Sequence, residues 1–600
     1  MKKSLFLIPA LAFAFASCSS DLETQNGQNN TPKDKGEENY IAVNIVAANA
    51  ITRAVDDAEN YEDGTGPENT VNVVRLYFFD EVGDAFVVNT DNTGSYSYVN
   101  ITSGFVDGGK NDPNVEKIIT AVAPVSLPAG FYPSQVIAVI NPGDYLNGQN
   151  LASLSDVQGA TNINQVTCSF ATTNLEDFVM SSSVYSNGAT SEPQVMETAS
   201  VSAANFFTAP AAAQANPVTI YVERTIGKVS LTTTLQAATG VTASETIYNT
   251  GEEYESNPVY VKFLGWNVTA TATESYLMKN INPAWSETLF GQGSGQPWNY
   301  AGFFRSFWAV NPSDVKFNYY PFGFKSVENG NEFENSANPS AANAITGFST
   351  PAEDSNDPAN YTYLQENAAY DFETGAGSNH PSQVIVAAQL CDEAGEPLTI
   401  AEWGNGQYTV EGLTNILLSS IRTNLNPWKK TDTGYSQIEA EDIEFVTAMS
   451  LNDNLRNWEA KGRYYVYAQL TSTAKEYTWY SGQPANNDVE SNLSSTQINE
   501  GLINLGHAKI WNNGYTYYYF DIRHLGTETS DGVYTPGYYG VVRNHIYKCN
   551  IESLSGLGTP VYDPEEVIYP EKPLDEDTYI AAKINILSWR IVNQNVSFAW

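Results

Sequence analysis

The sequence predicts an all-β protein that is built from β-sandwich domains and carries long loop insertions. Aromatic residues are frequent, with 37 Tyr, 26 Phe and 11 Trp, whereas only 16% of the residues are charged. This composition suits pleated, half-buried strands. Short apolar stretches are separated by polar segments with Gly and Pro, and helical periodicity is weak, which is typical of sandwiches. A length of 600 residues exceeds one ordinary core, so two or three domains are expected.

Charge and motif content exclude several classes of function. The formal net charge is −39, from 68 acidic and 29 basic side chains, so a phosphate backbone would be repelled and no nucleic-acid partner is expected. The four cysteines lie far apart and the four histidines form no ligand pair, so neither a metal nor another cofactor is predicted. No nucleophile, phosphate-loop or dinucleotide motif is present, and we predict that the chain is not an enzyme.

The N-terminal segment resembles a bacterial lipoprotein signal. Residues 1–17 combine two lysines with an apolar core that is too short to span a bilayer. Small residues then lead to Cys18, the position at which such signals are cut and the cysteine receives acyl chains such as palmitate. We therefore expect export and attachment to the outer membrane through Cys18, followed by a polar tether. A plain secretory signal is the alternative.

A strand and an arginine follow the tether. In the segment NYIAVNIVAANAITRAVDD at 39–57, the residues Ile41, Val43 and Ile45 share one parity, and therefore one face of a strand. Arg53 is the first arginine of the chain, and small residues flank it. This setting favours proteolysis at Arg53; an ordinary surface arginine is the alternative.

The body of the chain divides into two domains. We place the boundary near Thr225, between an N-terminal domain at 54–225 and a longer C-terminal domain at 226–555. The best helical pattern lies near 413–425. Two stretches of the second domain are expected to be long loops, residues 326–360 and 476–505.

The C-terminal extension, residues 556–600, differs from the domains. It begins with a connector rich in proline and acidic residues, which predicts a stiff, extended chain. The segment YIAAKI at 579–584 resembles YIAVNI at 40–45, so strands from opposite ends of the chain could occupy equivalent grooves. Apolar residues of one parity then continue to the last residue: Val592, Val596, Phe598 and Trp600.

Several motifs together resemble one family, the fimbrillins of Bacteroidales or type V pilins, and especially the shaft subunit of the short fimbria. Besides the lipoprotein start and the early arginine, the resemblance rests on four segments: VTIYVERTIGKVSL at 218–231, LGWNVTATATESYLMKN at 264–280, VVRNHIYKCNIESLSGLG at 541–558 and INILSWRIVNQNV at 584–596. The last two segments are the most specific, and the region 280–500 matches little.

The resemblance implies two transthyretin-like β-sandwich domains and a route of assembly. An Arg-specific surface protease would cut the lipoprotein precursor after Arg53, making Ala54 the mature N-terminus. Residues 18–53 would be a propeptide whose strand is a temporary plug in a groove. After its removal, a C-terminal donor strand of a neighbouring copy would fill the groove, through Ile584, Ile586, Val592, Val596, Phe598 and Trp600.

The implied product is a homopolymer on the cell surface that supports adhesion, with anchor and tip subunits as further partners. Whether one or both C-terminal strands insert stays open. An anchor or tip subunit of the same pilus is one alternative. A surface-anchored glycan-binding lipoprotein is another, since it would also use exposed aromatic residues. The apolar C-terminal strand argues against a glycan binder, which has no use for it.

Overall fold

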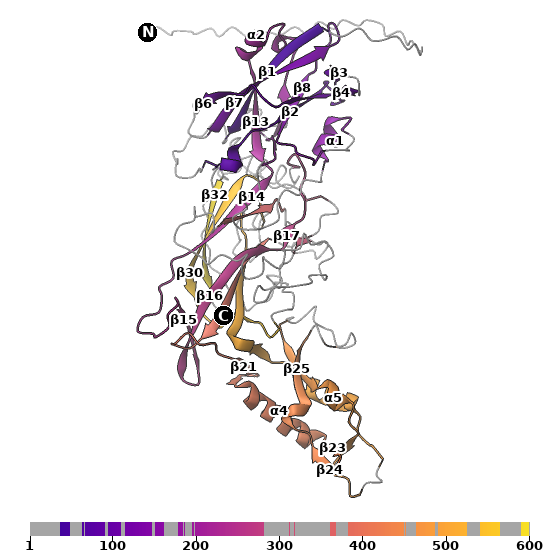
Figure 1. The fold of residues 1–600 in the computed structure, drawn as a ribbon, viewed down its shortest axis with the longest axis vertical. Helices are drawn as coiled ribbons and strands as arrows, with labels where there is room; N and C mark the ends of the chain where they lie inside the picture. The colour runs from indigo at the N-terminus through magenta and orange to yellow at the C-terminus, as the bar shows by residue number, and fades with distance from the viewer. Residues whose placement is uncertain are drawn as a thin grey trace, which may run out of the picture.

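The structure is a computed structural model of the chain. It describes residues 37–48, 63–64, 66–90, 94–109, 115–146, 151–160, 178–183, 185–186, 195–196, 198–280, 311–312, 317–318, 361–367, 382–448, 451, 464–486, 490–524, 540–563 and 590–598. These residues form mainly β-sheets, stacked as an N-terminal sheet, a central sandwich and a smaller unit with helices (Figure 1). The prediction of an all-β fold with β-sandwich domains is confirmed.

In the residues described, the N-terminal domain is built around one nine-stranded sheet. Its order is β5-β2-β8-β9-β13-β1-β7-β6, with β12 beside β8. The strands are β1 (Glu37–Ala48), β2 (Val74–Phe79), β5 (Tyr98–Ile101), β6 (Val106–Gly109), β7 (Val115–Leu127), β8 (Gln135–Ile140), β9 (Met180–Ser182), β12 (Ala199–Ser200) and β13 (Val218–Arg224). Short elements beside them are β3 (Asn89–Thr90), β4 (Ser95–Tyr96), β10 (Tyr185–Ser186), β11 (Val195–Met196), α1 (Leu154–Gln158), α2 (Pro210–Gln214), η2 (Gly66–Asn69) and η3 (Ala203–Asn205).

Apolar side chains cover both faces of this sheet. The sheet folds over so that β5 contacts β7, and Val99 of β5 and Ala121 of β7 lie in one enclosed core. On the opposite face, Tyr77 and Phe79 pack with Val157 of α1. The central strands are therefore buried on both sides, which explains why Leu76–Phe79 of β2 and Val136–Ile140 of β8 are continuous apolar runs rather than alternating ones.

The central body is a two-sheet sandwich. One sheet has the order β19-β14-β30-β32, and the other β15-β16-β20-β29-β31. Side chains from both enclose one core, in which Leu231 and Cys549 of the first sheet meet Trp266 and Phe520 of the second. The elements are β14 (Ile226–Thr233), β15 (Tyr248–Tyr254), β16 (Asn257–Thr269), β17 (Thr271–Ala272), β18 (Phe317–Asn318), β19 (Tyr361–Gln365), β20 (Gln383–Cys391), β29 (Tyr515–Asp521), β30 (His545–Leu554), β31 (Thr559–Pro560) and β32 (Arg590–Phe598).

A third unit is inserted between β20 and β29 and has a core of its own. It lies at the end of the molecule away from β1 (Figure 1). Its elements are β21 (Ile400–Trp403), β22 (Gly406–Tyr408), α4 (Val410–Asn424), β23 (Pro427–Thr431), β24 (Gly434–Gln437), η9 (Ala440–Asp442), β25 (Ile443–Thr447), β26 (Val466–Leu470), α5 (Ser472–Lys475), β27 (Trp479–Ser481), α6 (Ser495–Ile503), β28 (Lys509–Trp511) and η11 (Asn512–Gly514).

Helix α4 confirms the helical pattern near 413–425. Thr409 caps it by accepting a hydrogen bond from the Gly412 amide at 3.0 Å. Its buried residues, which include Leu413 and Leu417, recur at helical spacing. By contrast, the interpretation of 476–505 as a loop is wrong in part, since β27 and α6 lie within it. No helix among the described residues is long and apolar enough to cross a membrane.

A buried ionic cluster joins the N-terminal sheet to the sandwich. Glu68 of η2 is 1% exposed, and its carboxylate lies 2.9 Å from Lys228 Nζ of β14. Tyr363 of β19 donates its hydroxyl proton to the same carboxylate. Arg224 donates to the Glu68 carbonyl oxygen at 2.7 Å and to Asn544 Oδ1 at 3.0 Å. Side chains on both sides of the Thr225 boundary therefore share one set of buried charges.

Two further buried ion pairs lie near this junction. Lys279 Nζ is 3.4 Å from Glu223 Oε2, and Arg543 is 2.8 Å from Glu366 Oε2. Arg543 also donates to the Leu277 carbonyl oxygen at 2.8 Å. The Lys279–Glu223 pair links the segment after β17 to β13 of the N-terminal sheet, whereas Arg543 and Glu366 both belong to the central body. Each buried ion has a partner of opposite charge, without which its burial would be costly.

The cluster lowers the pKa of Glu68. Burial alone would raise this pKa, but the Lys228 and Arg224 cations and the Tyr363 hydroxyl outweigh burial and hold it below its ordinary value of 4.5. The stabilisation is therefore complete above about pH 4.5 and is lost as the pH falls through the lower pKa of the folded state.

We expect Glu68→Gln to lower the free energy of unfolding by roughly 3–5 kcal/mol, because it leaves Lys228 buried without its counter-charge. Urea unfolding at pH 7 measures this loss. Glu81→Gln, at an exposed turn residue, is the control and should change stability by less than about 0.5 kcal/mol. Equal effects of the two substitutions would contradict the proposed role of the cluster.

The same pair of proteins gives a pH test. Since protonation removes the charge that the substitution removes, the stability difference between wild type and Glu68→Gln should shrink as the pH falls below about 4.5. Urea unfolding at a series of pH values measures it. A difference that stays constant down to pH 2 would show that charge is not the origin of the effect.

Candidate assembly site

The strand that precedes Arg53 lies in the interior of the N-terminal sheet. β1 pairs antiparallel with β7 along its whole length, from Glu37 opposite Leu127 to Ala48 opposite Val115. On its other edge it pairs parallel with β13, from Val43 to Ala47. Nearer its start, Tyr40 and Phe207 exchange backbone hydrogen bonds of 2.7 and 2.9 Å. β1 therefore lies between β7 and β13. Without β1, the edges of these two strands that face each other would have unpaired backbone groups.

The side chains of β1 belong to the core. Ile41, Ala42 and Val43 are all 0% exposed. Ile41 and Val43 lie in the enclosed core with Ala121 and Ala123, which stand opposite them on β7. Ile45 follows in the same register, opposite Ile119. The role of Ile41, Val43 and Ile45 as a temporary plug stays a prediction.

The space that β1 occupies, between β7 on one side and β13 with Phe207 on the other, is here called the β1 slot. Each backbone hydrogen bond in such a slot contributes about 1 kcal/mol net, and each buried Ile or Val side chain roughly 1.5–3 kcal/mol. A vacant slot would expose two rows of unpaired amides and an apolar floor, which is an aggregation-prone edge unless another strand covers it. The slot is thus suited to accept a strand from another molecule.

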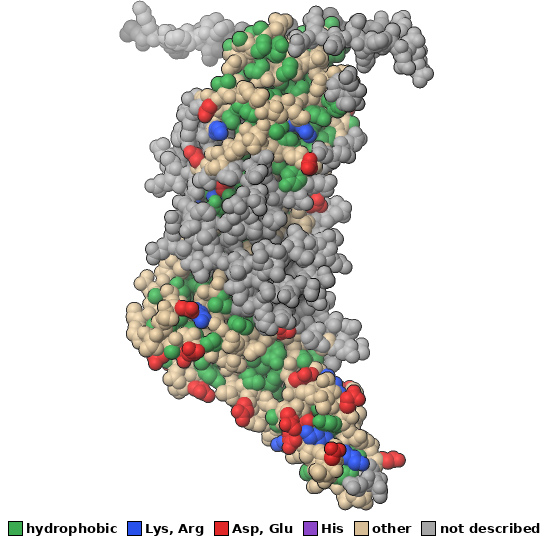
Figure 2. All heavy atoms as spheres, in the orientation of Figure 1, with side chains coloured by type: hydrophobic (Ala, Val, Ile, Leu, Met, Phe, Trp, Pro, Cys, Tyr) green, Lys and Arg blue, Asp and Glu red, His purple; other side chains and the backbone are tan. Residues whose placement is uncertain are grey.

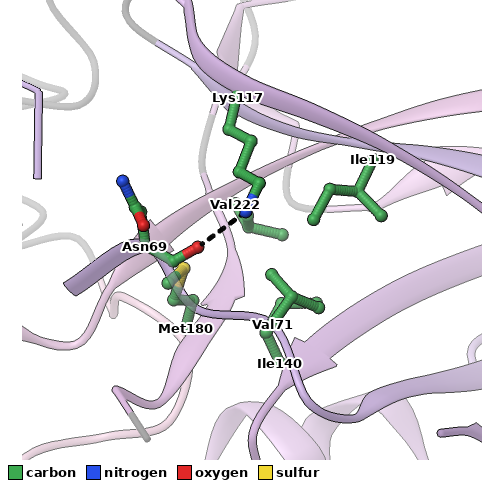
Figure 3. A pocket seen from close by; sticks show the side chains of 7 residues that line it. All are labelled: Asn69, Val71, Lys117, Ile119, Ile140, Met180 and Val222. Atoms are coloured by element: carbon green, nitrogen blue, oxygen red, sulfur yellow. Dashed lines mark hydrogen bonds between the residues drawn. The ribbon is translucent and has the colours of Figure 1, made fainter. Parts of the chain in front are cut away.

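A small cavity lies at the end of the slot. The Lys117 ammonium group reaches across it to the Asn69 carbonyl oxygen, at 3.4 Å (Figure 3). Lys117 and Val222 both stand opposite Ala47 of β1. The residues that line the cavity are Asn69, Val71, Lys117, Ile119, Ile140, Met180 and Val222. The cavity therefore adjoins β7 and β13 where these strands pair with the end of β1.

The C-terminal strand lies elsewhere, on the central sandwich. β32 pairs parallel with β30, and of the strands that the structure describes it is the last in its sheet. Val592 stands opposite Tyr547, and Val596 stands opposite Ile551. Phe598, the last of the predicted donor residues that the structure describes, stands opposite Leu554. An edge strand is held by one partner, whereas β1 is held by two.

Several predicted site residues lie outside the described residues: Cys18, Arg53, Ala54, Ile584, Ile586 and Trp600. Their roles stay predictions. The residues that form the slot, chiefly those of β7 and β13, were not predicted as site residues. The signal that could have found them is the apolar parity of β13, because Val218, Ile220 and Val222 alternate in sequence and all lie in the core.

Charged side chains gather over the inserted unit, at the lower end of the face shown in Figure 2. They pair with each other: Lys429 lies 2.7 Å from Asp442 and 3.2 Å from Glu439. In the part of the chain that the structure describes, no group of His, Cys, Asp and Glu side chains could hold a metal ion.

The region from β28 into β32 matches a known family. Residues 509–595 match the family described as major fimbrial subunit protein type IV, fimbrillin, C-terminal. The chain carries a fimbrillin C-terminal region. This match confirms the resemblance to fimbrillins over the C-terminal part of the sequence. The fimbrillin region includes β29, β30 and most of β32, so the C-terminal extension is part of the family pattern.

Several solved structures resemble this chain at low sequence identity. A fimbrilin from Porphyromonas gingivalis is 11% identical over 94% of this chain and 98% of its own, with a TM-score of 0.34. A Parabacteroides distasonis protein provisionally described as a cell adhesion protein is 14% identical over 59% and 76%, with a TM-score of 0.29. A C-terminally truncated tip fimbrial protein of Porphyromonas gingivalis is 11% identical over 62% and 83%, with a TM-score of 0.25. Because these identities and TM-scores are low, the resemblance to fimbrillins rests on the match of residues 509–595. No curated protein sequence matches the chain.

We expect Val43→Asp to lower the free energy of unfolding of the uncut chain by more than about 3 kcal/mol, because it buries a charge without a partner in the apolar floor of the slot. Thermal unfolding measures the loss. The control is Val82→Asp at a residue that is 75% exposed, which should be nearly neutral. If Val43→Asp left the free energy of unfolding unchanged, β1 would not be packed as described.

Proposed function

We propose that this chain is the major shaft subunit of a type V fimbria that supports surface adhesion. It is exported as an outer-membrane lipoprotein through Cys18, activated by an Arg-specific protease that cuts after Arg53, and polymerised by exchange of a C-terminal strand. The observation that carries the proposal is the interior position of β1, a strand with two partners that precedes the proposed cleavage site.

Cleavage after Arg53 would act on this strand directly. β1 ends at Ala48, so a cut at Arg53 separates the whole strand from the body of the chain. A detached strand leaves the slot at a finite rate and is diluted away, whereas a strand within the same chain returns. The slot, once vacant, has the open edges and apolar floor that a donor strand covers.

The donor strand would come from the C-terminal extension of a second copy. Among the described strands β32 pairs only with β30, so its release breaks fewer backbone hydrogen bonds than the release of a strand with two partners. The slot lies in the N-terminal sheet, whereas β32 lies on the central sandwich. Exchange therefore joins the head of one copy to the tail of the next, and a head-to-tail contact that does not close gives an open fibre.

We expect Arg53→Ala to leave a full-length lipoprotein that does not polymerise, since β1 stays in the slot. Mass spectrometry of the surface protein should show acylated Cys18 instead of Ala54 as its N-terminus, and gel ladders of polymer should be absent. Arg53→Lys keeps the charge but should also escape an Arg-specific protease. Asp56→Ala, three residues beyond the proposed site, is the control that should be cut and should assemble normally.

Two results would contradict the proposal. Polymer formed by uncut Arg53→Ala would show that β1 need not leave. A wild-type subunit within the shaft that still carries acylated Cys18 would indicate an anchor instead of a shaft subunit.

A further inference from the structure

Two histidines lie side by side in the interior of the central sandwich. His524 follows β29 of one sheet, and His545 is the first residue of β30 in the other. They are 1% and 2% exposed, and their ring centroids lie 5.1 Å apart in an edge-to-face arrangement. These two residues are here called the histidine pair. Histidine is the side chain that ordinarily changes its charge between pH 5 and 8, so the pair is a candidate for a response to acid.

Hydrogen bonds assign the protons of the pair. His545 Nδ1 lies 2.7 Å from the Arg543 carbonyl oxygen, which can only accept, so this nitrogen donates. The Tyr547 hydroxyl oxygen accepts a hydrogen bond from the Val542 amide at 2.7 Å and lies 3.0 Å from His524 Nδ1. The hydroxyl donates its own proton to His524 Nδ1, so that nitrogen carries no proton. We therefore assign His524 as a neutral ring with its proton on Nε2.

A second proton on either ring is costly in this position. A proton added to His524 Nδ1 faces the Tyr547 hydroxyl, which then loses its acceptor. Both rings also lie in the interior, where the charged form of a side chain is disfavoured. Arg543, a fully buried cation in the same segment as His545, adds a like charge. Proton uptake therefore favours an opened arrangement in which water reaches the rings.

The carboxylates around the pair already have partners. Besides Tyr547, the segments around the pair carry these ionisable residues: Asp521, Arg523, Glu366, Arg543, Cys549 and Arg590. Glu366 lies 2.8 Å from Arg543. Asp521 is attracted by Arg523 and accepts a hydrogen bond of 2.8 Å from Gln383. Arg590 of β32 stands opposite His545. Among these described groups, both carboxylates therefore already face an arginine.

The segment 541–547 also joins the N-terminal sheet to the sandwich. Arg224 of β13 donates to Asn544 Oδ1 at 3.0 Å, and the Asn544 amide donates to the backbone of β14 at 2.7 Å. Packing here is tight, because a Cβ added at Gly227 would lie 2.7 Å from Val541 Cγ1. A displacement of this segment therefore disturbs the contacts that hold the two bodies together.

We propose that the histidine pair makes the joint between the N-terminal sheet and the central sandwich sensitive to acid. Near neutral pH both rings are uncharged, and residues 541–547 stay closed on β14. Below about pH 6 the rings take up protons, the segment opens, and the joint loosens. The inference does not depend on the proposed function, because it concerns the single, uncut chain.

The direction of the pH dependence follows from which state binds more protons. Histidine in an unfolded chain takes up its proton near pH 6.5, whereas the closed pair resists protonation. The stabilisation by the pair is therefore complete above about pH 6.5 and is lost as the pH falls below this value. Asp521 acts in the opposite direction, because burial raises its pKa to about 6 and the folded chain then holds this proton more tightly than the unfolded chain. The difference between wild type and a histidine variant isolates the pair.

Hydrogen exchange of the uncut full-length chain, measured by mass spectrometry at pH 7.5 and 5.5, tests the proposal. The double variant His524→Asn with His545→Asn keeps an acceptor and a donor near the two Nδ1 positions but does not titrate. Protection of peptides from 541–547 should fall at least about tenfold more in wild type than in this variant, because each ring that is protonated in the open state alone contributes a factor of about ten. The control is His507→Asn, at an exposed histidine of the inserted unit, which should behave as wild type.

An equal pH dependence in wild type and the double variant would overturn the proposal, as would a loss of protection at pH 5.5 that spares residues 541–547. If the double variant does not fold, exchange of the histidine C2 protons in the wild-type chain decides, because its rate reports the charge of each ring. His507 should then titrate as an exposed histidine, whereas His524 and His545 should show no titration between pH 6 and 8. Titration of either buried ring in that range would contradict the proposal.

Discussion

The interior position of β1 is the constraint on which the rest of the structure depends. A strand within a sheet satisfies the backbone groups of two neighbours, so the edges of β7 and β13 that face each other are paired only while a strand lies between them. The side chains of Ile41 and Val43 complete the core that these strands enclose. The N-terminal domain therefore needs a strand at this position but not necessarily this strand, and that distinction makes exchange between chains physically reasonable.

The second constraint is the buried ionic junction. Three of the segments that carry the family resemblance meet there, because Arg224, Lys279 and Arg543 come from 218–231, 264–280 and 541–558. Buried charges tolerate little displacement from their partners, so the junction fixes the N-terminal sheet on the sandwich. In the proposed fibre such a joint would transmit tension along the subunit instead of acting as a hinge.

In the inserted unit, sequence periodicity predicted the long helix but not the short strands. Helix α4 was predictable because its apolar residues recur at helical spacing over fifteen residues. The short strands β27 and β28 have three residues each, too few for any periodicity to distinguish them from a loop. Their pairing with β23 and β21 depends on partners far away in the sequence, which local propensity does not encode.

The sequence by itself determined the all-β class, the apolar parity of the terminal strands, the family resemblance and the absence of any motif for catalysis. These features depend on residue type and spacing alone. Only the tertiary structure decided that β1 lies between β7 and β13, that β32 pairs with β30 at the edge of its sheet as far as the chain is described, and that Lys117 and Val222 line a small cavity. Strand partners and cavities arise where segments distant in sequence pack together, and the periodicity of one strand does not specify its neighbours.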